Sequence, residues 1–335
     1  MKVRVSVLVA AFTLTIAGCA TQPAPPGWYA GDDAKYNKKD YLTGRGQAAT
    51  LAEAQNRARA DLAQIFQVAI KVVAEDVQKY KSNSATPGKG QFSVDTLQRI
   101  TTYTDQVVKG IQIAETWRDP VSNNITALAI LPRPQAEGSL RAQIRQLDEA
   151  VQTSIDQSKN NADVLARIFA ANKAIAAHLE REGLQSALQV IDITGTGAVS
   201  PHSSARLKFD LEEMLKSVRI SPKILNGSAS GLEEVVTGAL THAGFSVDSA
   251  APTFVVKASL KLSDIGIIDG WYWQRGSLEV SVSEAETGRV RGAQRWPIKG
   301  SGKERASAIR RSLDEASEVL KKELGTTITG MAGVR

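Results

Sequence analysis

The sequence predicts an α+β fold: two small antiparallel-sheet domains with covering helices, joined by a helical hairpin. Three patterns predict it. Apolar and polar residues alternate from Val255 to Ser263, as in a strand with one solvated face. The segment from Leu140 to Leu184 is nearly free of Gly and Pro and has apolar residues at helical spacing. Turn residues such as Glu286-Thr287-Gly288 separate the strand-like runs. We divide the chain into a leader at 1–18, a tether at 19–26, domains at 27–136 and 191–335, and a connector at 137–190.

The leader has the pattern of a secretory signal peptide. Lys2 and Arg4 precede an uncharged run of roughly 12 residues, too short for a membrane-spanning helix, which needs about 20. The only cysteine follows at once, and Ile16-Ala17-Gly18-Cys19 resembles the lipobox of bacterial lipoproteins. This resemblance implies that the chain is cut before Cys19 and that Cys19 carries diacylglyceryl and acyl groups such as palmitate. The alternative, a buried cysteine in an ordinary helix, fits neither the length nor the flanks of the run.

The residues after Cys19 indicate where the lipidated protein resides. In the lipoprotein family an Asp after the cysteine marks inner-membrane retention, and this chain has Ala20 there, which indicates the outer membrane. Pro23, Pro25 and Pro26 keep the chain extended, so the tether reaches at most about 30 Å. We therefore expect a folded body that faces the periplasm close to the lipid surface.

Composition narrows the class of protein further. The formal charge is +6, and removal of Lys2 and Arg4 with the leader lowers it to +4. A small charge with interleaved signs is typical of a solvated surface, so we expect no nucleic-acid partner. Because Cys19 is the only cysteine and is used for lipid, the chain has no disulfide and no cysteine-based metal site.

The first domain reads as alternating strands and helices. A strand from Tyr36 to Gly44 leads to a capping box, Thr50 to Glu53, that begins a helix. Beyond Phe66 the pattern is ambiguous between a strand and a longer helix, and the β-branched residues of 68–72 favour the strand. We further expect a helix at 94–103 and strands at 107–117 and 125–131, which gives a β-α-β-α-β-β order.

These residues carry a family resemblance. YLTGRGQAATLAEAQNRARADLAQIFQVAI, followed by VKGIQIAETWRD and NITALAILPR, resembles the LPP20 lipoprotein domain across 27–134. Its hallmarks are a strand, a Gly-x-Gly turn, an alanine-rich helix and a closing hairpin. Relatives of this domain occur in surface lipoproteins and flagellar assembly factors, which implies a role in assembly.

The connector and the second domain follow. Two apolar stripes break at Asn160-Asn161, which predicts a helical hairpin or one long interrupted helix. We expect it to pack in the core; a coiled coil that binds a partner is the alternative. In the second domain we expect a hairpin of Trp271–Ser283 and Arg289–Lys299, then a final helix at 302–324 that begins with a capping box at Ser301–Glu304. The remaining elements are helices at 205–217 and 231–243 and a strand at 218–225. Their order is loosely similar to the amino-terminal domains of TolB-type periplasmic proteins.

No residue pattern predicts catalysis, a cofactor or a metal. Gly44 to Ala49 matches Gly-x-Gly-x-x-Ala, but Thr50 caps the helix too late for a dinucleotide site, so we expect a strand-to-helix turn. His178, His202 and His242 lack metal-ligand spacing and an adjacent nucleophile motif, although a spatial triad stays open. We therefore expect a protein that is not an enzyme and has no cofactor.

One aromatic cluster is the candidate partner-binding site. Trp271 and Trp273 share a strand face, Tyr272 lies on the other, and Trp296 lies on the partner strand. Such aromatics either pack beneath a helix or form an exposed patch for a protein or glycan.

Together these patterns predict an outer-membrane-anchored, periplasmic lipoprotein with a non-catalytic structural or assembly role, for example in flagellar or surface-structure assembly. Its partners would be the membrane, through Cys19, and envelope proteins; the oligomeric state is left open. A regulator of peptidoglycan synthesis is the alternative, and a cell-wall hydrolase is a third.

Overall fold

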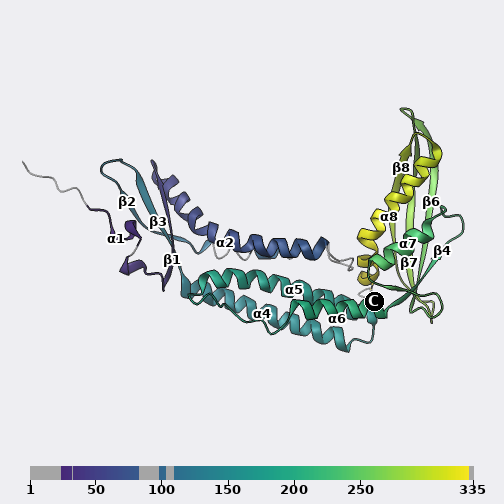
Figure 1. The fold of residues 1–335 in the computed structure, drawn as a ribbon, viewed down its shortest axis with the longest axis horizontal. Helices are drawn as coiled ribbons and strands as arrows, with labels where there is room; N and C mark the ends of the chain where they lie inside the picture. Colours follow the sequence, from purple (N-terminus) through teal and green to yellow (C-terminus); the bar gives the residue numbers. More distant parts are fainter. Residues whose placement is uncertain (1–23, 32, 83–97, 103–108, 332–335) are drawn as a thin grey trace, which may run out of the picture.

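The computed structural model of the chain describes residues 24–31, 33–82, 98–102 and 109–331. The leader, Cys19 and most of the tether lie outside these residues. Half of the helix expected at 94–103 also lies outside them, and its described half, 98–102, is helical. Figure 1 shows two sheet-containing arms at opposite ends of a long helical base, and both arms project from the same side of that base. The fold is α+β with a helical hairpin between two sheets, as the sequence predicts.

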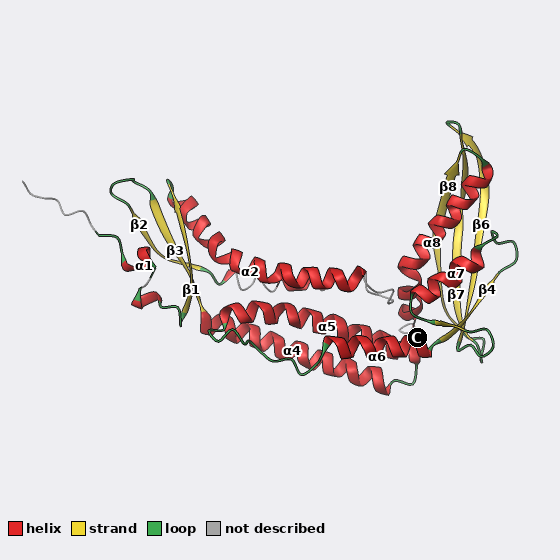
Figure 2. Ribbon diagram, viewed as in Figure 1, coloured by secondary structure: helices red, strands yellow, loops and turns green. Residues whose placement is uncertain are grey.

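The first arm and the base contain α1 (Gly27–Ala30), η1 (Ala34–Tyr36), β1 (Tyr41–Ala48), α2 (Leu51–Ser82), β2 (Gln112–Arg118), β3 (Ile125–Pro132), α4 (Arg133–Asn160), α5 (Val164–Ile191) and α6 (Ser204–Ser217). The second arm contains β4 (Arg219–Ile224), α7 (Leu232–His242), β5 (Ser246–Val247), β6 (Phe254–Ile268), β7 (Trp271–Glu284), β8 (Val290–Gly302) and α8 (Arg305–Gly330). Figure 2 shows how the helices of the base separate the two sheets.

The first sheet is antiparallel, in the order β1-β3-β2. Its central strand, β3, is buried at seven consecutive positions from Ile125 to Leu131, so both of its faces are covered. Helix α2 covers one face. On the other face Trp28, which is 2% exposed, packs with Leu128 and Ile130. The chain that follows the tether is therefore part of the fold from its first described helix onward.

The Gly-x-Gly segment lies within β1, so the turn expected there is wrong. A Cβ on Gly46 would lie 2.2 Å from the Ala58 backbone nitrogen, and one on Gly44 would lie 2.7 Å from the Ala58 carbonyl oxygen. These glycines allow the backbone of α2 to lie directly against the strand. The turn comes at residues 49 and 50, and Thr50 accepts a hydrogen bond from the Glu53 amide (3.3 Å), as the capping box predicts.

The strand favoured for residues 68–72 is also wrong, because α2 runs without a break from Leu51 to Ser82. The expected β-α-β-α-β-β order therefore has one strand too many. β-Branched residues only weakly disfavour a helix. Helix α2 has begun well before residue 68, and it packs along α5. The tertiary contact outweighs the local preference.

Helices α4 and α5 form the expected helical hairpin, broken after Asn160. Asp163 caps α5 by accepting a hydrogen bond from the Leu165 amide (3.0 Å), and it also pairs with Arg291 of the second sheet. Deep in the base Arg181, 1% exposed, binds Asp148 (3.1 Å) and the Ala198 carbonyl oxygen (2.6 Å). These contacts hold the hairpin to the second arm and to the loop that follows α5.

The second sheet has the order β5-β4-β6-β7-β8. Strands β6, β7 and β8 are antiparallel, whereas β4 adds to β6 and β5 in parallel. Helices α7 and α8 pack on one face, where Val256, Ala258 and Leu260 are fully buried, as the alternation of β6 predicts.

The last helix begins later than its expected cap. Ser301 still lies in β8, opposite Trp273, because the strand continues to Gly302. The observed capping box pairs Glu304 with Ser307, and α8 runs from Arg305 to Gly330. Ser301–Glu304 is therefore not the capping box of this helix.

Candidate functional site

The predicted aromatic cluster lies at the end of the β6–β7 hairpin, at the top of the second arm in Figure 1. Asp269 and Gly270 form its two-residue turn with φ values of 52° and 76°, which suits the twist of a tight hairpin. Ile268 pairs with Trp271, and Ile267 pairs with Tyr272. We call residues 265–273 the hairpin tip.

The hairpin tip is apolar and exposed. Ile265, Ile267 and Ile268 are 48%, 60% and 48% exposed. Trp271, Tyr272 and Trp273 are half-buried. The three isoleucines are not among the residues predicted for this site, although the Asp-Gly pair in DIGIIDGWYW is a hairpin-turn signal that places them beside the tryptophans.

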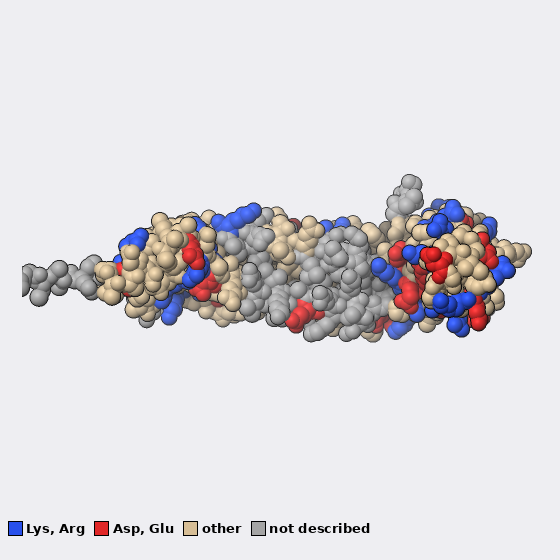
Figure 3. Space-filling model, turned by 90° about the horizontal axis from the view of Figure 1, so that it is seen from above, with Lys and Arg blue, Asp and Glu red and all other residues tan. Residues whose placement is uncertain are grey.

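Basic side chains border the hairpin tip. The Lys303 ammonium lies 4.2 Å from the centre of the Trp271 ring, and the Arg311 guanidinium lies 5.8 Å from it. Arg305 pairs with Asp264 at 2.9 Å. Figure 3 shows this arm from above, where uncharged residues, drawn in tan, are flanked by basic and acidic side chains.

Trp296 does not join this surface. It is 6% exposed, belongs to the core of the second arm, and donates a hydrogen bond from Nε1 to Glu323 of α8 (2.6 Å). Of the four predicted residues, the structure brings Trp271, Tyr272 and Trp273 to the hairpin tip and places Trp296 beneath a helix. Packing beneath a helix therefore describes Trp296, whereas a binding role for the three half-buried residues at the hairpin tip stays a prediction.

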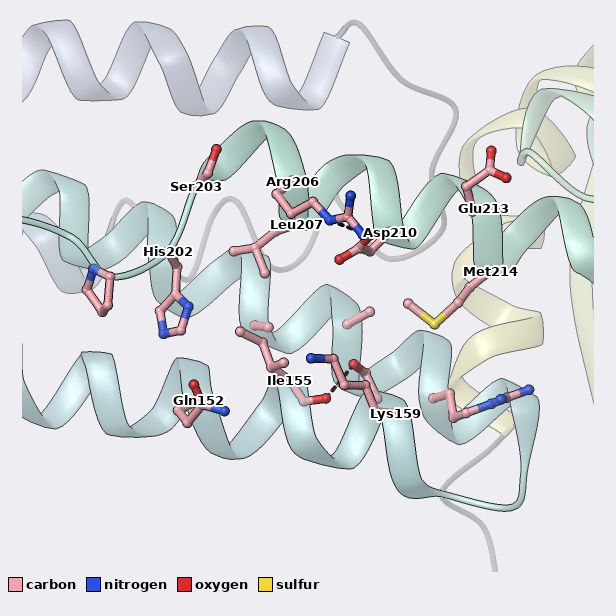
Figure 4. A pocket seen from close by; sticks show the side chains of 15 residues that line it. Gln152, Ile155, Lys159, His202, Ser203, Arg206, Leu207, Asp210, Glu213 and Met214 are labelled. Atoms are coloured by element: carbon pink, nitrogen blue, oxygen red, sulfur yellow. Dashed lines mark hydrogen bonds and ion pairs between the residues drawn. The ribbon is translucent and has the colours of Figure 1, made fainter.

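A second candidate is a groove of about 710 Å³ in the base, lined by α4, α5, α6 and the loop before α6 (Figure 4). The His202 ring points into it toward Gln152, whereas Ser203 points away from it. Asp210 is engaged by Arg206 at 2.9 Å. This arrangement does not combine serine, histidine and carboxylate as a catalytic triad requires.

The other two histidines lie elsewhere. His178 is buried in α5, and this burial lowers its pKa and favours the neutral ring. His242 is exposed near the end of α7. Among the described residues no group of three or more His, Cys, Asp or Glu side chains could hold a metal ion. In the same part of the chain no helix has the length and hydropathy that crossing a membrane requires.

A lipoprotein of the cell envelope is the class of protein that the comparison with family models supports. Residues 26–131 match the LPP20 lipoprotein family, which confirms the resemblance over that segment. The matched segment includes the buried Trp28, all of β1 and β2, and all of β3 except Pro132. No curated protein matches the sequence.

Solved structures with some similarity come from several bacteria. A secreted protein of Helicobacter pylori is 12% identical, covers 85% of this chain and 97% of its own, and has a TM-score of 0.41. A proposed lipoprotein of Caulobacter crescentus is 15% identical over 36% of this chain and 93% of its own, with a TM-score of 0.27. A minor lipoprotein of Acinetobacter baumannii is 12% identical over 35% of this chain and 89% of its own, with a TM-score of 0.24.

Proposed function

We propose that this chain is an outer-membrane-anchored periplasmic lipoprotein with a non-catalytic role in assembling envelope structures. The observation that carries this proposal is the arch of Figure 1, in which a helical base separates two sheet-containing arms. At 1.5 Å per residue, the 28 residues of α4 span roughly 42 Å. A protein of this shape suits holding components a fixed distance apart.

The join between the tether and the first arm supports a mechanical role. Trp28 donates a hydrogen bond from Nε1 to Glu115 (2.7 Å), and the same carboxylate accepts one from Tyr36 (2.9 Å) and pairs with Lys35 (2.5 Å). The pKa of Glu115 is lowered chiefly by the hydrogen bond from Lys35. The described fold begins at Gly27, so force on a lipid at Cys19 would reach the first sheet through the short tether.

Regulation of peptidoglycan synthesis is the second candidate. The length of the base favours it, because the base adds roughly 40 Å to the reach of the short tether. Partner identity separates the two functions.

Two experiments test the proposal. Cys19→Ser should leave the precursor uncleaved and remove the mature protein from the outer-membrane fraction, as measured by membrane fractionation and mass spectrometry. A photo-crosslinking residue at Gln152 in the groove or at the exposed Val121 of the first arm should capture envelope-assembly proteins in intact cells. Capture of wall synthases alone would favour the second candidate. Mature Cys19→Ser protein in the outer membrane would contradict lipid anchoring.

A further inference from the structure

We propose that the hairpin tip is a second membrane contact, which inserts its isoleucines into the interface of the bilayer that holds the lipid on Cys19. This inference rests on the proposed anchoring, and it names an anionic lipid surface as the partner of the second arm.

The apolar surface of the hairpin tip is the first argument. Single exposed apolar residues are common, but here three isoleucines lie within four positions beside three aromatic residues. Ile267 pairs with Tyr272 and Ile268 pairs with Trp271, so they form an apolar patch over both faces of the hairpin tip. The turn at Asp269 and Gly270 holds this patch at the end of a long two-stranded hairpin, where strands of 15 and 14 residues pair. Helix α8 begins only at Arg305, after β8 has ended beside Tyr272.

The aromatic and basic side chains are the second argument. Trp and Tyr favour the boundary between lipid headgroups and acyl chains, and Trp271, Tyr272 and Trp273 follow the isoleucines along the hairpin. Lys303 and Arg311 lie over Trp271, where their charges can meet headgroup phosphates while their stems cover the ring. Of the charged residues that the contacts place at the hairpin tip, Lys303, Arg305 and Arg311 are basic, and Asp264 and Asp269 are acidic. This excess complements an anionic surface.

The shape favours a bilayer over a protein. A stable protein interface buries about 800 Å² on each partner, more than the ends of three isoleucines can offer. A bilayer interface instead accepts a small projecting apolar tip that enters it. Both arms project from the same side of the base, so one membrane can meet them both (Figure 1). A second contact would stop the body from turning about its tether.

The test uses the chain from residue 19 onward with Cys19→Ser, so that no lipid is attached. We expect it to float with vesicles of phosphatidylglycerol and phosphatidylethanolamine and to bind phosphatidylcholine vesicles more weakly. Replacing both Ile267 and Ile268 by Asp should lower the partition coefficient by roughly tenfold or more. The matched control is Val290→Asp, at an equally exposed position (62%) on β8 in the same arm, and it should bind like the parent chain. Circular dichroism should show that all variants are folded.

Charge is tested separately with Lys303→Glu. It should weaken binding to the anionic vesicles, with little change for phosphatidylcholine, and added salt should have the same effect. Failure of the parent chain to bind anionic vesicles would overturn the inference. Equal binding by the Ile267→Asp, Ile268→Asp variant would also overturn it, as would self-association through the hairpin tip without vesicle binding. Because the chain used with the vesicles carries no lipid, its failure to bind them would not contradict anchoring through Cys19. Conversely, the fractionation of Cys19→Ser in cells does not test whether the hairpin tip binds vesicles.

Discussion

The two arms build the same strand–helix contact in different surroundings. In the first, Gly44 and Gly46 of β1 lie against Ala58 of α2; in the second, Gly300 and Gly302 of β8 lie against Ala308 of α8. In both, the strand directly precedes the helix that packs across it. In these two segments Gly-x-Gly lies within a strand and allows close packing of a helix backbone.

The arms differ on the face of each sheet that lies opposite its packed helix. The segment that carries Trp28 covers the first sheet, and β3 is buried on both faces. The second sheet leaves polar side chains such as Lys261 and Glu279 exposed there. The first arm is therefore covered on both faces of its sheet, and the second keeps a solvent-exposed face and an apolar tip.

The largest expected effect comes from removing the cover of the first sheet. Trp28→Ala should lower the free energy of unfolding by about 3–5 kcal/mol, because it empties a buried site and leaves Glu115 without one hydrogen-bond donor. Urea unfolding measures this loss. Trp271→Ala, at a half-buried position, should cost far less. Equal losses would mean that the two faces do not differ as described.

The glycine contact comes next. Gly46→Ala should destabilise the fold by about 2–3 kcal/mol, since the new methyl group would meet the backbone of α2. Gly302→Ala should act in the same direction but less strongly, because its nearest neighbour is the Ser307 hydroxyl. Gly138→Ala, with nothing within 4 Å inside α4, is the control and should stabilise the helix by about 0.5–1 kcal/mol. A neutral Gly46→Ala would refute the packing role.

A smaller, pH-dependent effect distinguishes the β7–β8 turn. Hydrogen bonds from Thr287, Arg289 and Arg291 lower the pKa of Glu284 from 4.5 to about 2. A lowered carboxyl pKa contributes stability that is complete above the unfolded-state value and is lost as the pH falls toward 2. Glu284→Gln should therefore be less stable at pH 7, and its unfolding curve should converge with that of the parent chain near pH 2. Glu286→Gln, at an exposed neighbouring position, is the matched control.

The smallest expected effects are increases in the stability of the fold. Thr126 Oγ1 in the first sheet and Gln274 Nε2 in the second are buried without a hydrogen-bond partner among the described residues. Thr126→Val and Gln274→Met keep approximate size and remove these polar atoms, so each should raise stability by up to about 1 kcal/mol. Thermal unfolding would measure the change. A loss at either position would indicate that water or another group serves the polar atom.

Much of this fold could be predicted because the signals are local. The alternation of β6, the break at Asn160 and the cap at Thr50 each depend on neighbouring residues. The helix through residues 68–72 could not, because packing along α5 overrides the local β preference. At the site, Trp271 and Trp273 were found from strand spacing, whereas the pairing of Trp296 with Glu323 depends on where α8 lies in space.

Helix α5 contributes apolar residues to the cores of both arms. Its first half, including Ile168 and Ile175, belongs to the core of the second arm, and its second half, including Leu184 and Leu188, belongs to the core of the first. Neither arm can be excised by cutting near this helix without stripping the remaining half of apolar partners. An arm exchanged for a homologous module would therefore have to match the apolar stripe that α5 presents to it.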